Sequence, residues 1–133
     1  HAPHTKEEKD KKEPIFGVTG LEHVLPLMLD AVNKGRITLS RLIELTSLNP
    51  AKIFGIKNKG KIEVGYDADI IVVDMNLKKI VSDERLFTKC GWSPYAGLDL
   101  QGWPIITIVN GKIIYNNNEI VDHKGSEVEY DEL

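Results

Sequence analysis

The spacing of apolar side chains predicts helices in the first 55 residues of the chain. Between residues 19 and 35 they recur every three or four positions, which is typical of one buried helix face. The repeating residues are Leu21, Val24, Leu25, Met28, Leu29 and Val32. Thr19 and Glu22 fit a capping box at the start, and Gly35 fits a stop. We therefore predict a helix over residues 19–35, with Pro26 near its first turns, where proline disrupts least.

Two shorter helices are expected before Gly55. The first starts at Thr38, and its buried side comprises Leu39, Leu42, Ile43 and Thr46. The second starts at Asn49-Pro50, interpreted as an N-cap followed by a first-turn proline. Upstream of all three helices, residues 5–13 carry mixed charges and no apolar face, so we expect a solvated loop there.

After Gly55 the pattern becomes that of strands. Residues 61–64 alternate in polarity and residues 68–74 form a β-branched run. Asn110-Gly111 separates two apolar runs, which indicates a hairpin with a type I′ turn, and residues 116–118 indicate a second turn. Residues 75–104 are predicted to be irregular, and the acidic tail from residue 124 to be frayed. Helices followed by a few short antiparallel strands suggest an α+β fragment, whose sheet edges need further chain to pair with.

Composition narrows the class of protein. The 133 residues are 41% hydrophobic and 28% charged, with a net charge of −3, which excludes disorder throughout. No apolar run approaches the roughly 20 residues of a membrane span, and the slight acidity argues against nucleic-acid or membrane-surface binding. The single cysteine, Cys90, excludes a disulfide framework or a multi-cysteine zinc site, and it favours a reducing, cytoplasmic location.

Several residues invite a chemical interpretation. His1 and His4 could approach a metal, but Pro3 favours an extended backbone and no third ligand is near, so an exposed loop is the simpler interpretation. Asp67 and Asp69 resemble an acid/base pair, but their place before a strand favours turn and structural hydrogen bonding. His23 is expected to be a packed or surface side chain. Trp92 and Trp103 could stack on a ring, but beside prolines they are expected to cover a core.

Several motifs together resemble dihydroorotase, a cyclic amidohydrolase, over roughly residues 1–116. They are His-Ala-Pro-His at 1–4, Phe-Gly-x-x-Gly-Leu-Glu at 16–22, Asn-Pro-Ala-Lys-Ile-Phe-Gly at 49–55, Gly-Tyr-Asp-Ala-Asp-Ile at 65–70, Trp-Ser-Pro-Tyr-Ala-Gly at 92–97 and the hairpin at 107–112. The segments at 49–55 and 65–70 are shared by many amidohydrolases, whereas His-Ala-Pro-His is narrower. The resemblance is to the C-terminal third of that family.

The resemblance implies an α/β fold. Residues 1–55 would supply the C-terminal end of a TIM-type (β/α)8 barrel, and residues 56–133 part of a composite β-sandwich. It also implies zinc-dependent, reversible hydrolysis of L-dihydroorotate to N-carbamoyl-L-aspartate in de novo pyrimidine (UMP) biosynthesis. Two zinc ions would be bound mainly by upstream residues, and the general acid/base Asp would stand immediately before His1. No catalytic residue and no metal ligand is then expected within these 133 residues.

The substrate contacts implied by the resemblance lie in this chain. His4 would contact the substrate carboxylate, with the main chain of Ala2 beside it. Backbone groups of Phe16 and Gly17 would meet the pyrimidine ring, where a missing Cβ permits close approach. For His1, an orienting role at the strand end is favoured over metal ligation.

Alternatives remain open. They are a hydantoinase or allantoinase, a non-catalytic amidohydrolase-like scaffold that assembles with a carbamoyltransferase, and a small stand-alone binding module. Because the chain has no initiator Met, we expect it to be a fragment. We expect the fragment to be inactive without its N-terminal segment, because the metal ligands and the acid/base Asp that the resemblance implies are not among these residues. Possible further partners are a second copy and aspartate carbamoyltransferase.

Overall fold

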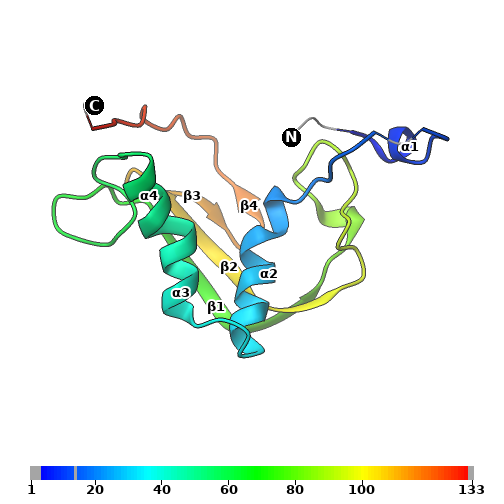
Figure 1. The fold of residues 1–133 in the computed structure, drawn as a ribbon, viewed down its shortest axis with the longest axis horizontal. Coiled ribbons are helices and arrows are strands. Elements are labelled where there is room, and N and C mark those ends of the chain that lie inside the picture. Colours follow the sequence, from blue (N-terminus) through cyan, green and yellow to red (C-terminus); the bar gives the residue numbers. More distant parts are fainter. Residues whose placement is uncertain (1–3, 14, 132–133) are drawn as a thin grey trace.

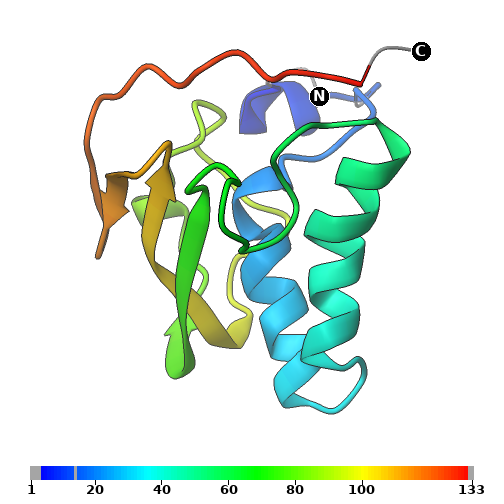
Figure 2. The ribbon, with the colours of Figure 1, turned by 90° about the vertical axis from the view of Figure 1, so that its left-hand side faces the viewer.

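The computed structural model describes residues 4–13 and 15–131 and has two layers. A sheet forms one layer, and helices cover one of its faces (Figures 1 and 2). The helical segments are α1 (Lys6–Lys9), η1 (Leu21–His23), α2 (Val24–Asn33), α3 (Leu39–Ile43), η2 (Glu44–Leu48), α4 (Asn49–Ile53) and η3 (Asp83–Arg85). The strands are β1 (Ile70–Ile80), β2 (Asp99–Val109), β3 (Lys112–Asn116) and β4 (Glu119–Ile120). Helix α2 lies against β2, and α3 packs against α2.

The strands form an antiparallel sheet in the order β1-β2-β3-β4. Asn110 and Gly111 join β2 to β3 with φ values of 48° and 76°, which confirms the predicted type I′ hairpin. Asn117 and Asn118 also have positive φ values, of 45° and 75°, and connect β3 to β4 as predicted. Local turn chemistry therefore sets the register of this part of the sheet.

The prediction that residues 75–104 are irregular was wrong at both ends. Strand β1 continues to Ile80 and β2 begins at Asp99. The β-strand pattern of the sequence is interrupted at Asp74, whose carboxylate accepts hydrogen bonds from the backbone N–H groups of Asn76 and Leu77. The pairing of β1 with β2 shifts register at the same place. Pro104 lies within β2 beside a second register shift, a place where a missing N–H is tolerated. Residues 61–64, predicted as a strand, have no regular structure.

Helix α4 begins at Asn49, but Asn49 is not the N-cap that was predicted. Asn49 is already helical (φ −70°, ψ −43°), and α3, the π-helical turn η2 and α4 follow one another without a break. Pro50 has no N–H and its ring crowds the carbonyl four residues earlier. The helix widens into the π-helical turn η2 before Pro50 and does not end there. On the predicted buried side Leu42 is buried, but Leu39 and Ile43 are about half exposed.

The predicted capping box at Thr19 and Glu22 does not form. The segment begins with the 3-10 turn η1, whose N-cap Gly20 makes no side-chain cap. Reciprocal capping bonds occur instead between Thr5 and Glu8, so the expected charged loop contains the short helix α1. The tail also differs from prediction, because residues 129–131 hydrogen-bond to residues 55–57.

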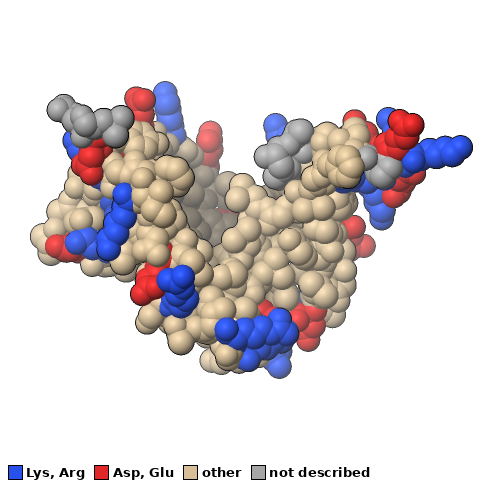
Figure 3. Space-filling model, viewed as in Figure 1, with Lys and Arg blue, Asp and Glu red and all other residues tan. Residues whose placement is uncertain are grey.

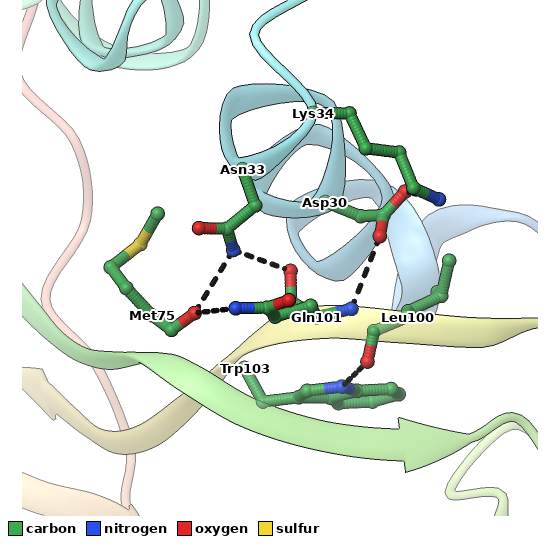
Figure 4. A network of polar contacts seen from close by, with 7 residues as sticks. All are labelled: Asp30, Asn33, Lys34, Met75, Leu100, Gln101 and Trp103. Atoms are coloured by element: carbon green, nitrogen blue, oxygen red, sulfur yellow. Dashed lines mark hydrogen bonds and ion pairs between the residues drawn. The ribbon is translucent and has the colours of Figure 1, made fainter.

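Helix α2 reaches the sheet very closely at Gly102. A Cβ on Gly102, which has φ +102°, would lie 2.7 Å from the Leu29 Cβ. Beside it, the Asn33 amide donates to the carbonyls of Met75 and Gln101, both at 2.9 Å (Figure 4). Asp30, which also pairs with Lys34, accepts from the Gln101 N–H at 3.2 Å. These hydrogen bonds connect residues before position 55 to residues after it, where a domain boundary is expected. That boundary stays a prediction.

The core of the described residues is small. Its buried apolar side chains are Leu29, Leu42, Ala51, Val81, Cys90 and Leu100. Many large apolar side chains are exposed, and Figure 3 shows a mostly uncharged surface over the helices with charged groups toward its edges. Within residues 4–13 and 15–131, no helix has the length and apolar character that a bilayer crossing requires.

Candidate functional site

His4 is held at both its side chain and its backbone. It lies just before α1, and its side chain is 21% exposed. The ring Nδ1 is 3.7 Å from the Glu8 Oε2, which also accepts the Thr5 N–H at 2.8 Å. The His4 carbonyl accepts the indole N–H of Trp92 at 2.7 Å. His4 is thus fixed between a local helical turn and a loop far along the sequence.

Trp92 belongs to the segment of residues 82–98 between β1 and β2, here named the latch loop. Two side chains from the start of the α2 segment hold this loop. The Thr19 hydroxyl, which is buried, donates to the Trp92 carbonyl at 3.3 Å. The Glu22 carboxylate accepts from the backbone N–H groups of Phe87 and Thr88 at 3.0–3.2 Å. Thr19 and Glu22 therefore position the latch loop, which explains why they form no capping box.

Phe16 and Gly17 occupy a more open position. The Phe16 side chain is 95% exposed. Gly17 has φ +96°, and no atom lies within 4 Å of the place where its Cβ would be. The Lys9 ammonium donates to the Ile15 carbonyl, which connects this segment to α1 and hence to His4. Because glycine has no side chain and this position is open, its backbone can be approached closely by a planar ring. The resemblance predicts such a contact for Gly17. Ala2, the fourth predicted contact, and His1 lie outside the described residues.

The two aspartates that resemble an acid/base pair serve the structure. Lys59 pairs with Asp67 at 2.9 Å and with Asp69, and Asp69 accepts the Asn110 N–H at 2.8 Å. The hydrogen bond to Asp69, then that to Asp67, raises the pKa of Lys59. Burial by itself would raise the pKa of Asp69, but the Asn110 N–H and Lys59 outweigh it and lower that pKa. This confirms their structural interpretation.

A cavity of about 730 Å³ lies apart from the predicted substrate contacts. Its walls include His23, Lys79, Arg85, Phe87, Trp103 and Tyr115. His23 was expected to be either a packed or a surface side chain, and it is buried. Its Nδ1 lies 3.4 Å from the Ser93 hydroxyl. His4, Phe16 and Gly17 are not among the lining residues. Across the described part of the chain, no group of three or more His, Cys, Asp or Glu side chains could hold a metal ion.

Two features of this site were not predicted from the sequence. Glu8 beside His4 could have been found, because Thr5-x-x-Glu8 is a capping-box pattern. The contact of Trp92 with His4 has no sequence signal, since 88 positions separate the two residues.

The comparison with known families agrees with the resemblance that the sequence motifs carry. Residues 18–114 match the amidohydrolase family, and the chain belongs to that family. Among curated relatives, the dihydroorotase of Pyrococcus furiosus is 48% identical over 121 residues, which is 91% of this chain and 28% of that protein. The dihydroorotase of Methanosphaera stadtmanae is 48% identical over 122 residues, or 90% of this chain and 28% of that protein.

Solved structures give a similar result for the fold. An L-hydantoinase (dihydropyrimidinase) from Arthrobacter aurescens has a TM-score of 0.82 at 35% identity, covering 86% of this chain and 26% of that one. A D-hydantoinase from Thermus sp. has a TM-score of 0.79 at 28% identity, covering 84% and 25%. The chain thus spans little more than a quarter of the length of these relatives. The resemblance to the C-terminal part of dihydroorotase is confirmed.

Proposed function

We propose that this chain is the C-terminal part of a zinc-dependent dihydroorotase. The whole protein would interconvert L-dihydroorotate and N-carbamoyl-L-aspartate in cytoplasmic pyrimidine biosynthesis. The observation that carries the proposal is the 48% identity to dihydroorotases over 121 residues. The identity to the structurally similar hydantoinase is lower, at 35%.

His4 would bind the ring carboxylate of dihydroorotate. An imidazole N–H donates well to a carboxylate, and such charge-assisted bonds are stronger than neutral ones. The ring lies 3.7 Å from the Glu8 carboxylate and the His4 carbonyl is bound by Trp92, and these contacts would help to orient the donor before substrate arrives. Backbone groups of Ala2, Phe16 and Gly17 would align the pyrimidine ring.

The rest of the active site would come from an N-terminal segment of the same protein. That segment would complete the (β/α)8 barrel and the β-sandwich, of which this chain supplies the ends. The exposed apolar side chains support this, because large apolar surfaces mark places where further protein packs. The described residues do not fit a zinc site by themselves, so zinc and the general acid/base Asp would also belong to the upstream segment.

The test uses the full-length, zinc-loaded protein that contains this chain. Turnover of dihydroorotate, without turnover of hydantoin or allantoin, is the expected result. In that protein His4→Ala should raise KM for dihydroorotate about tenfold or more, since hydrogen bonds to charged groups contribute about 1.5–3 kcal/mol. Lys12→Ala, an exposed change in the same segment, is the matched control. Unchanged kinetics of His4→Ala would contradict the assigned role.

A hydantoinase is the second candidate, favoured by the TM-score of 0.82 to L-hydantoinase. Hydantoin has no carboxylate for His4 to bind. Opening of hydantoin in preference to dihydroorotate, with no effect of His4→Ala, would move the assignment to this class. A folded, zinc-loaded protein inactive on all three rings would instead support the scaffold alternative.

A further inference from the structure

We propose that Trp92 is a positioning residue that holds His4 in its substrate-binding orientation. The inference rests on the proposed role of His4. It adds to that role Trp92, a residue of the latch loop that from the sequence is expected only to cover a core.

The first support is the geometry of the contact. The Trp92 Nε1 lies 2.7 Å from the His4 carbonyl oxygen, a short bond for an N–H donor. An indole N–H can only donate, and it points along one direction fixed by the ring. The bond therefore restrains the position of the His4 backbone, and with it the point from which the imidazole side chain extends.

The second support is that Trp92 is itself held. Its carbonyl accepts the buried Thr19 hydroxyl, and the next residue, Ser93, donates its backbone N–H to the Asp83 carboxylate at 2.8 Å. The loop is further fixed where Glu22 accepts two backbone N–H groups. A series of hydrogen bonds thus runs from the start of the α2 segment through Trp92 to His4.

The third support is that the other contact of His4, with Glu8, comes from a weak local element. The helix that follows it, α1, has only four residues and no buried side chain. Helices this short have little stability of their own in water. A preorganised binding group is best held by well-fixed elements, and for His4 the latch loop supplies a restraint that the exposed turn by itself lacks.

The experiment separates the indole N–H from the bulk of the ring. In the full-length, zinc-loaded protein, Trp92 is replaced by 3-benzothienylalanine, an isosteric analogue with sulfur in place of the N–H, and separately by Phe. Both should raise KM for dihydroorotate about fivefold and change kcat less than twofold, because a bond that only positions a binding group acts on ground and transition states alike. Trp103→Phe is the matched control, since its indole donates to the Leu100 carbonyl instead.

A double-mutant cycle with His4→Ala completes the test. If Trp92 acts through His4, the Trp92→Phe change should add no further increase in KM once His4 is removed. Full additivity, or a benzothienyl variant with unchanged KM, would overturn the inference while leaving the proposed function intact. Failure of the wild-type protein to open dihydroorotate, or an unchanged KM in His4→Ala, would overturn the proposed function and this inference with it.

Discussion

The contact between α2 and the sheet and the contact between the latch loop and His4 are stabilised in different ways. At the first, two Asn33 side-chain hydrogen bonds, the Asp30 bond to the Gln101 N–H and tight packing at Gly102 lie side by side on α2. At the second, single hydrogen bonds join the latch loop to His4, and also to Thr19 and Glu22 at the start of the α2 segment, across 65–88 positions of sequence. We infer that changes at the first contact act on the free energy of unfolding, while changes at the second act on local geometry with little loss of stability.

The largest expected effect is at the first contact. Gly102→Ala should lower the free energy of unfolding by about 2–4 kcal/mol, because the new methyl group would overlap Leu29 and the backbone has φ +102°. Urea denaturation of the full-length protein measures this. Gly111→Ala is the matched control, since it also has positive φ but open space around its Cβ, and it should cost about 1 kcal/mol. Equal costs at both positions would show that packing against α2 contributes nothing.

Asp30 should make the same contact sensitive to acid. Burial would raise the pKa of its carboxyl, but Lys34 and the Gln101 N–H outweigh burial and lower that pKa below 3.8. The folded state then binds this proton less readily than the unfolded state. Its stabilisation is therefore complete above about pH 4 and is lost as pH falls through the lowered value.

Asp30→Asn tests this acid dependence. At pH 7 it should lower the free energy of unfolding by about 1–2 kcal/mol, since a charged acceptor is lost. Its Tm should then fall less steeply than that of the wild type between about pH 5 and pH 2. Parallel pH profiles for the two proteins would be inconsistent with the assigned shift. Asp10→Asn, an exposed carboxylate on the C-cap of α1, is the control and should keep the wild-type profile.

The smallest effect on stability is expected in the latch loop. Glu22→Gln should lower the free energy of unfolding by about 1 kcal/mol or less, because the amide oxygen can keep one weaker bond. Hydrogen exchange at the Phe87 and Thr88 amides should nevertheless accelerate, while exchange in β2 stays unchanged. Acceleration across β2 as well would show that the two contacts unfold together and would remove the distinction between them.

Sequence patterns predicted those parts of the fold that depend on near neighbours. The helical repeat found α2, and Asn110-Gly111 found the hairpin, because both patterns specify backbone conformation over a few residues. The same reasoning failed where an element is interrupted locally and then continues. It ended a strand at Asp74 and placed the start of a separate helix at Asn49-Pro50, although pairing with β2 continues the strand and the π-helical turn joins the two helices.

The sequence by itself determined the family, the helical and hairpin segments, and His4, Phe16 and Gly17 as candidate substrate contacts. Only the tertiary structure decided what Thr19, Glu22 and Trp92 bind. Thr19 and Glu22 have the right types and spacing for a helix cap, yet each bonds to the latch loop. The physical reason is that a side-chain donor or acceptor takes whichever partner the folded chain brings within about 3 Å, and for these residues that partner is more than 60 positions away.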